Sequence, residues 1–231
     1  MDFPEYICVL DYEATCDGEK YYNNEIIEFP SVLLKWDGKN YQFISEFQKF
    51  CKPLLKPFVS KFCYELTGIT QEQVDNGGNF PEVLEDHYNW LMAYTNGNFY
   101  ILTCGYWDLG VVMINECKKW GICPKYQYRR LVNIKNEYRN FYKKERGVGM
   151  ATMLKELGIE LEGRHHSGLD DCKNICKILQ RMIVDGYKFH NDSVVKITEK
   201  SYIVNARKKK SIDNAKLAEK RFFKKPEIEY L

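Results

Sequence analysis

Residues 6–16, YICVLDYEATC, decide the fold of this chain. The uncharged run from Tyr6 to Leu10 suits both faces of a sheet, as a central strand requires. Asp11 and Glu13 follow, and residues two apart on a strand point to the same side. Two adjacent carboxylates at the end of a buried strand are costly unless cations lie between them. The stretch therefore predicts a central strand ending in two metal ligands; the alternative is that Asp11 is a turn residue and Glu13 a polar strand end.

The segments around this strand alternate between strand and helix patterns. Asp37-Gly38 is a turn signal, so the first three strands are expected to form an antiparallel meander. Strands are predicted over residues 6–14, 25–36, 41–51, 99–104 and 131–135. Helices are predicted after Thr70, from Pro81, over 108–120, over 150–157 and from Leu169 to Gly186. This order predicts an α/β protein with a ribonuclease H-like fold, whose mixed five-stranded central sheet is flanked by helices.

Composition is globular, with 45% hydrophobic and 29% charged residues among 231. The net charge is only +2, but nine Lys or Arg and two acidic residues lie between 207 and 225. Such a segment either contacts phosphates or is a solvated terminus or localisation signal. We expect a folded domain over residues 1–190 and a basic tail over residues 191–231, either partly helical or disordered.

The nine cysteines are scattered and include no CxxC pair, and several lie in apolar runs. We interpret them as reduced, buried thiols of a cytoplasmic or nuclear protein; disulfides or a zinc site are the alternative. Residues 1–15 lack the pattern of a signal peptide. No apolar stretch approaches the ~20 residues that a membrane-spanning helix needs.

A third acidic residue, Asp108, lies in TCGYWDLG (103–110) at a predicted strand-to-helix junction. An Asp at a helix start is often only an N-cap, but together with Asp11 and Glu13 it becomes a candidate metal ligand. Trp107 beside it offers an aromatic face to a nucleobase, or else packs in the core.

The segment GRHHSGLDDCKNI (163–175) precedes and begins the final predicted helix. At about 100° per residue, Asp171 borders the apolar face of that helix and Asp170 points outward, so Asp171 is the better ligand candidate. His165 or His166, on the preceding turn, could take a proton from a water near pH 7; a surface histidine pair is the alternative. The apolar face consists of Leu169, Cys172, Cys176, Leu179 and Ile183.

Four carboxylates of this kind suit two Mg²⁺ ions, with Mn²⁺ as a substitute. Two ions ~4 Å apart can stabilise the attacking and leaving oxygens of a phosphoryl displacement. The pattern therefore indicates a two-metal phosphodiester hydrolase.

The same residues resemble the DEDDh (DnaQ-like) 3′–5′ exonucleases, and most of all the three-prime histone-mRNA exonuclease group. The resemblance covers about residues 6–186. Its matching stretches are YICVLDYEATC, NEIIEFPSVLL, ELTGITQEQVD, FPEVL, GYWD, NFYK and GRHHSGLDDCKNI.

The resemblance implies a role for each matching residue. Asp11, Glu13, Asp108 and Asp171 would be the metal ligands. His166 would be the general base, since the histidine of that family lies five residues before its last Asp. The terminal nucleotide would be held near Glu13 and Ala14, by Trp107 and beside the turn formed by Leu66, Thr67 and Ile69.

We therefore expect a 3′–5′ exonuclease that releases nucleoside 5′-monophosphates from single-stranded RNA 3′ ends, with DNA as an alternative substrate. Its partner would be nucleic acid, with no membrane association. The alternatives are a DNA repair or proofreading exonuclease, and a catalytically weak nucleic-acid-binding protein with the same fold.

Overall fold

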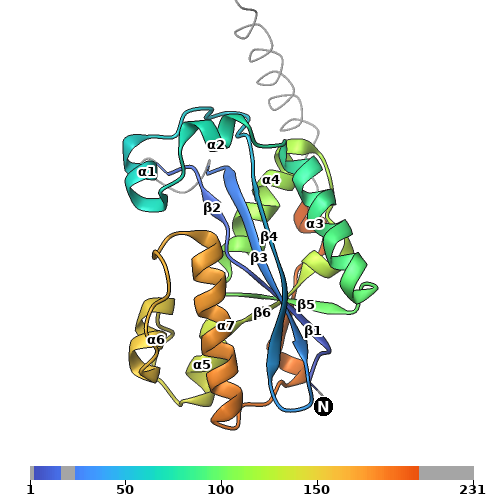
Figure 1. The fold of residues 1–231 in the computed structure, drawn as a ribbon. Helices are drawn as coiled ribbons and strands as arrows, with labels where there is room; N and C mark the ends of the chain where they lie inside the picture. The colour runs from blue at the N-terminus through green and yellow to red at the C-terminus, as the bar shows by residue number, and fades with distance from the viewer. Residues whose placement is uncertain (1–2, 17–23, 203–231) are drawn as a thin grey trace, which may run out of the picture.

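The computed structural model describes residues 3–16 and 24–202 (Figure 1). Its centre is a mixed seven-stranded sheet in the order β2-β3-β1-β5-β6-β7, with β4 paired to β3. Strands β1, β5 and β6 run parallel, and the other pairs are antiparallel. The strands are β1 (Tyr6–Leu10), β2 (Glu13–Ala14), β3 (Ile26–Trp36), β4 (Tyr41–Phe50), β5 (Phe99–Thr103), β6 (Arg130–Asn133) and β7 (Val194–Lys196).

Helices cover both faces of this sheet. In Figure 1, α5, α6 and α7 lie on one side of it and α3 and α4 on the other, while α1 and α2 lie beside β2. The helices are α1 (Lys61–Thr67), α2 (Gln71–Asp75), α3 (Phe80–Thr95), α4 (Met113–Trp120), α5 (Ile134–Phe141), α6 (Met150–Leu157) and α7 (Gly168–Val184). Short turns of helix are a π-helical turn, Asp108–Val112, and 3₁₀ turns at Tyr126–Arg129, Asn191–Ser193 and Glu199–Tyr202.

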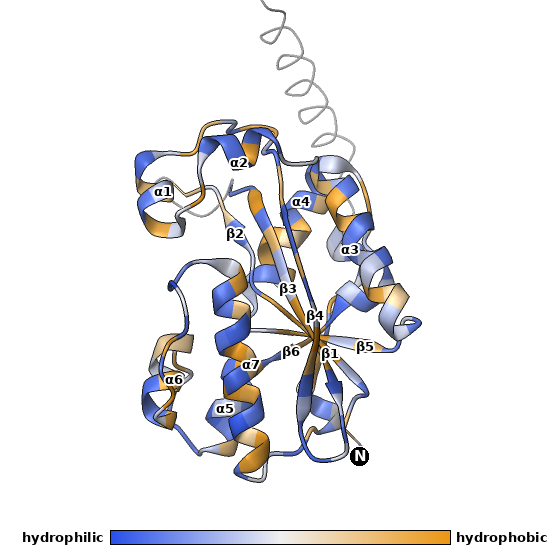
Figure 2. Ribbon diagram, in the orientation of Figure 1, coloured by the Kyte–Doolittle hydropathy of each residue, from blue (hydrophilic) through white to orange (hydrophobic). Residues whose placement is uncertain are grey.

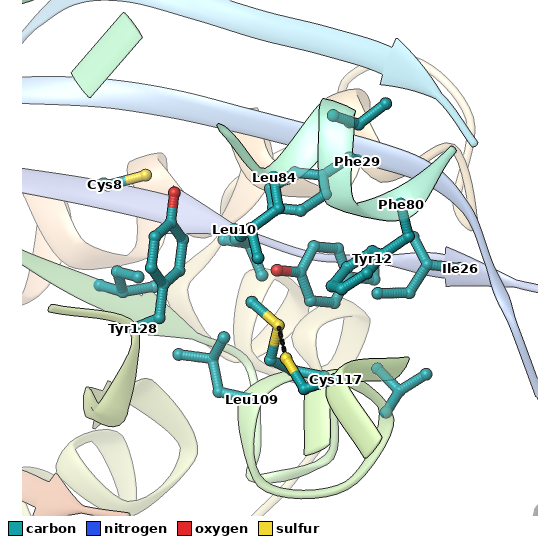
Figure 3. Close-up of a cluster of buried hydrophobic side chains, with 14 of the residues drawn as sticks. Cys8, Leu10, Tyr12, Ile26, Phe29, Phe80, Leu84, Leu109, Cys117 and Tyr128 are labelled. Atoms are coloured by element: carbon teal, nitrogen blue, oxygen red, sulfur yellow. Dashed lines mark hydrogen bonds between the residues drawn. The ribbon is translucent and has the colours of Figure 1, made fainter. Parts of the chain in front are cut away.

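The alternation of β1 divides the apolar interior into two cores. Cys8 and Leu10 contribute to the core that α3 and α4 cover, and part of this cluster is drawn in Figure 3. Ile7 and Val9 contribute to the opposite core, which α5, α6 and α7 cover. Figure 2 shows hydrophobic residues concentrated where the strands cross at the centre of the sheet, and helices with hydrophobic and hydrophilic residues on different sides. The expected central strand with two buried faces is therefore confirmed.

The sheet has seven strands rather than the expected five. The predicted strand over 6–14 is interrupted after Leu10, and its end forms the separate two-residue β2, whose pairing with β3 shifts register between Glu13 and Ala14. The other additional strand, β7, pairs antiparallel with β6. The sheet thus continues past residue 190, where we expected the domain to end. The basic segment 207–225 lies outside the described residues.

Most local signals match the observed helices. Thr70 and Gln73 form a capping box at the start of α2, and Pro81 lies in the first turn of α3. Gly158, in a left-handed conformation, ends α6. Helices α1 and α5 were not predicted; residues 134 and 135, expected to end a strand, instead begin α5.

A buried ion cluster joins α4 to the start of β3. Lys119 Nζ lies 2.6 Å from Glu25 and 2.9 Å from Glu116, and all three side chains are buried. Glu25 also accepts hydrogen bonds from the backbone N–H groups of residues 54–56. The cluster therefore fixes the chain between β4 and α1 next to the edge of the sheet that carries Glu13.

Within residues 3–16 and 24–202, no helix is both long enough and apolar enough to cross a membrane. The nine cysteines all lie in these ranges as thiols, and six of them are buried. This agrees with the expectation that they act as small hydrophobic residues.

Candidate active site

The expected site residues meet at the carboxyl ends of the parallel strands. Asp11 directly follows β1, and Asp108 begins the helical turn that follows β5. Because β1 and β5 are parallel, their ends reach the same edge of the sheet, where ligands bind in open α/β sheets. A cavity of about 440 Å³ opens there. Its lining includes Asp11, Glu13, Ala14, Leu66, Trp107, Asp108, Lys135, His165, His166 and Asp171.

Three of the four carboxylates are close enough to share one cation. One oxygen each of Asp11, Glu13 and Asp171 lie within 4.8 Å of one another. Asp108 is held beside them, because its Oδ1 accepts a hydrogen bond from the backbone N–H of Tyr12 at 2.9 Å. The π-helical geometry at Asp108 is a form of helix that is frequent at functional sites.

Gly168 lets α7 approach the end of β1. A Cβ atom at this position would lie 2.7 Å from the carbonyl oxygen of Asp11 and 2.6 Å from Pro30 Cγ. The backbone N–H of Gly168 also donates to Glu28 Oε2 at 3.2 Å. Since only glycine fits this contact, the start of α7 brings Asp171 to the carboxylates of the sheet.

The crowded carboxylates have strongly perturbed pKa values. Burial, followed by the charges of Asp108 and Glu13, raises the pKa of Asp11 well above its usual value. Burial and the charge of Glu28 raise the pKa of Glu13 to about 9. Burial also raises the pKa of Asp108 and of Asp171 to about 6 each, although each carboxylate accepts a backbone hydrogen bond. All four can be ionised at neutral pH only if cations compensate their charge.

The donor set fits divalent cations. Asp171 is 3% exposed, and its Oδ1 is buried with no hydrogen-bond partner among the described residues. A buried carboxylate oxygen without a partner is costly unless it coordinates an ion. Carboxylate oxygens are the ligands that Mg²⁺ and Mn²⁺ prefer.

The two histidines lie on the loop before α7. His166 has a left-handed backbone (φ 66°), and its N–H donates to Asp171 Oδ2 at 3.0 Å. The rings of His165 and His166 are stacked at 4.0 Å. Burial, together with the positive charges of His165 and Arg164, lowers the pKa of His166. His166 is therefore a neutral imidazole at pH 7, able to accept a proton.

Side chains of α7 hold this loop in place. Asn174 is fully buried; its Oδ1 accepts from the N–H of Glu162 at 2.9 Å, and its Nδ2 donates to the carbonyl oxygens of Glu162 and Asp170. Asp170 Oδ2 accepts from the N–H of Arg164 at 2.9 Å. Thus Asp171 faces the cavity, whereas Asp170 faces the loop.

The residues expected to border a nucleotide are only partly brought together. Ala14, Leu66 and Trp107 line the cavity. Thr67 and Ile69 do not: both are 4% exposed, because Thr67 hydrogen-bonds within the end of α1 and Ile69 packs in a small core with Val74. Of the turn expected to border the terminal nucleotide, Leu66 reaches the cavity, and the role of Thr67 and Ile69 in substrate binding stays a prediction.

Lys135 and Asn24 also line the cavity, and the sequence analysis named neither. Lys135 follows β6 as Asp108 follows β5, and β5 and β6 are parallel. Its position after a parallel strand was the signal that could have identified it. Asn24 lies two residues before the start of β3 and offered no comparable pattern.

Comparison with known proteins places the chain among the nucleases. The family model described as "Exonuclease" matches residues 8–179. The chain belongs to the exonuclease family. Among curated exonucleases, 3′-5′ exoribonuclease 1 of Mus musculus is 40% identical over 188 residues, 79% of this chain and 54% of the relative. ERI1 exoribonuclease 3 of Bos taurus is 35% identical, covering 84% and 59%. The chain thus spans somewhat more than half the length of these relatives.

Solved exonuclease structures are also similar to this chain. The nuclease domain of 3′hExo, described as a DEDDh family member bound to rAMP, superposes with a TM-score of 0.73 at 36% identity, covering 80% of this chain and 94% of that one. A 3′-exonuclease that recognises the 3′ end of a histone mRNA stem-loop gives a TM-score of 0.76 at 34% identity, covering 85% and 71%. The ribonuclease H-like fold and the resemblance to DEDDh exonucleases of the histone-mRNA group are confirmed. Exonucleases of this family use divalent metal ions, and the carboxylate cluster is a group that could hold them.

Proposed function

We propose that this chain is a two-metal 3′→5′ exonuclease that removes nucleoside 5′-monophosphates from single-stranded RNA. The observation that carries the proposal is the convergence of Asp11, Glu13, Asp108 and Asp171 beside the His165–His166 loop, in a chain of the exonuclease family. Its relatives are named as exoribonucleases, which favours RNA over DNA.

The four carboxylates would hold two Mg²⁺ ions, or Mn²⁺ in their place. When bound, the ions supply Lewis acidity that stabilises charge on the attacking and leaving oxygens. Glu13 reaches the cluster from β2, and Asp171 reaches it from the first turn of α7.

His166 would act as the general base. Its neutral ring would take a proton from the attacking water. The hydrogen bond from the backbone N–H of His166 to Asp171 Oδ2 fixes the loop that carries the ring. The cavity walls formed by Ala14, Leu66 and Trp107 would hold the terminal nucleotide, with the indole of Trp107 available for base stacking. The leaving group is the 3′ oxygen of the preceding nucleotide.

The test is digestion of 5′-labelled RNA and DNA oligomers of the same sequence, single- and double-stranded, with Mg²⁺ or with EDTA. We expect stepwise shortening of single-stranded RNA from its 3′ end in Mg²⁺ only. A DNA duplex with a mismatched 3′ end is included as a further substrate, and its faster digestion would instead favour a repair or proofreading enzyme. Binding without shortening would favour a nucleic-acid-binding protein.

The pH dependence should show two components on the acid side. The rate falls as pH decreases, because protonation of His166 removes its ability to act as a base. Protons also compete with cations at all four carboxylates, whose pKa values without bound metal are raised, to about 6 for Asp108 and Asp171 and to about 9 for Glu13. Raising Mg²⁺ should therefore move the acid limb of kcat/KM to lower pH. The limb should stop moving where protonation of His166, below its usual pKa, becomes limiting. An acid limb that does not respond to Mg²⁺ concentration would contradict this account.

Asn174→Ala should weaken both the fold and the catalytic loop. The loss of three hydrogen bonds should lower the free energy of unfolding by about 1–3 kcal/mol. Partners that orient a metal ligand or base typically contribute about 10–100-fold to activity, so kcat should fall by about tenfold. Urea unfolding and single-turnover rates would measure the two effects, with the exposed Asn136→Ala as a matched control. A stability loss with an unchanged rate would show that Asn174 does not position the loop.

A further inference from the structure

Lys135 places a positive charge in the carboxylate-rich cavity. Among the described residues that line the cavity, it is the single lysine or arginine. It lies at the beginning of α5, where Asn133 Oδ1 accepts a hydrogen bond from its N–H at 3.0 Å. The side chain extends over Gly105, and Nζ lies 3.7 Å from where a Cβ atom of that glycine would be. The cation is thus directed along the edge of the sheet toward the ends of β1 and β5.

The charge of Lys135 affects the pKa values of carboxylates in the cavity, but its Nζ forms no salt bridge with a carboxylate of the described residues. Among residues 3–16 and 24–202, no carboxylate forms a salt bridge with Lys135. Its positive charge nevertheless opposes the effect of burial, which raises the pKa of Asp11 and Asp108. Lys135 thus lines the same cavity as both carboxylates, and its Nζ is paired with neither of them.

The charge balance of the loaded site indicates what this amine would bind. Two divalent cations would compensate the four carboxylates, so the charge of Lys135 would remain for the substrate. A phosphodiester carries one negative charge, and its charge increases toward the transition state. We propose that Lys135 contacts a non-bridging oxygen of the scissile phosphate and keeps hold of that phosphate in the nucleoside 5′-monophosphate product. This proposal rests on the proposed exonuclease function and adds a catalytic residue to it.

Product binding separates this role from simple screening of the carboxylates. The affinities of adenosine 5′-monophosphate and adenosine would be measured by calorimetry in Mn²⁺ for the wild-type chain, Lys135→Met and Lys135→Arg. Hydrogen bonds to charged groups contribute enough that the preference for the monophosphate should fall about tenfold or more in Lys135→Met. Adenosine affinity should stay within about twofold in every variant, because the nucleoside lacks the group that Lys135 contacts. Lys135→Arg should recover part of the preference.

Two further measurements decide between explanations. Lys155→Met changes an exposed lysine of α6 that does not line the cavity, and it should behave as wild type. Mn²⁺ affinity of Lys135→Met should be unchanged or higher, since a cation is removed from beside the ligands. An unchanged phosphate preference, or a loss explained entirely by weaker Mn²⁺ binding, would overturn the role of Lys135. Failure of the wild-type chain to shorten RNA in the same preparation would instead overturn the proposed function.

Discussion

Asp171→Asn should lower the rate of Mg²⁺-dependent RNA shortening by roughly 10³-fold, since an ion that stabilises transition-state charge contributes several kcal/mol. Asp170→Asn should lower it by no more than about threefold, because its carboxylate faces the loop and an amide oxygen can also accept the N–H of Arg164. Asp171 is buried, lies within 4.8 Å of its two acidic neighbours and has an Oδ1 with no partner among the described residues. The same Asp→Asn change at two adjacent positions thus distinguishes the proposed metal ligand, Asp171, from its neighbour, Asp170.

Thermal unfolding gives a second measurement that does not depend on turnover. Cations that bind only the folded state at 100 times their Kd stabilise it by about 2.7 kcal/mol. We expect wild type and Asp170→Asn to show this Mg²⁺-dependent gain and Asp171→Asn to lose most of it. Equal losses of activity in the two variants would contradict the assignment of Asp171 as the ligand.

His166→Ala should reduce kcat by about 10²–10⁴-fold, the usual contribution of a positioned general base. His165→Ala should reduce it by less than about fivefold. The two rings are stacked and both line the cavity, but only His166 has its backbone bonded to Asp171. Single-turnover rates across pH would measure both effects.

The direction in which the acid limb of the pH profile moves distinguishes the two histidines. The positive charge of His165 helps to lower the pKa of His166, so His165→Ala should move the acid limb to slightly higher pH. His166→Ala should remove the part of that limb that Mg²⁺ does not shift. A large loss of rate in His165→Ala together with a small loss in His166→Ala would show that His165, and not His166, is the base.

The gathering of the acidic residues was predictable because each step follows from local rules. Asp11 and Glu13 follow one apolar run, and Asp108 follows another; parallel pairing of these strands then brings the three carboxylates to one edge. The choice of Asp171 over Asp170 needed only the helical period, and its burial of 3% agrees with that choice. The long periodic segment of α7 and the capping box of α2 could equally be predicted from the sequence.

What the sequence did not reveal depends on contacts between distant segments. The Lys119–Glu25–Glu116 cluster joins residues separated by more than 90 positions, and each of its members alone is indistinguishable from a surface charge. Thr67 and Ile69 lie in a motif whose outward face cannot be told from its inward face without knowing how α1 sits on the sheet. The three residues of β7 are too few to show a periodicity, and they form a strand only because β6 offers an open edge.

The two oxygens of Asp171 are not equivalent, and this difference bears on which ion the site selects. Oδ2 already accepts a hydrogen bond from the N–H of His166, whereas Oδ1 has no partner among the described residues. A cation held by this side chain would therefore be favoured at Oδ1. Mg²⁺ accepts few protein oxygens and retains several waters, whereas Ca²⁺ seeks six to eight ligands and often chelates both oxygens of one carboxylate. The hydrogen bond that fixes the loop of His166 would thus also make chelation by both oxygens, and with it binding of the larger ion, less favourable.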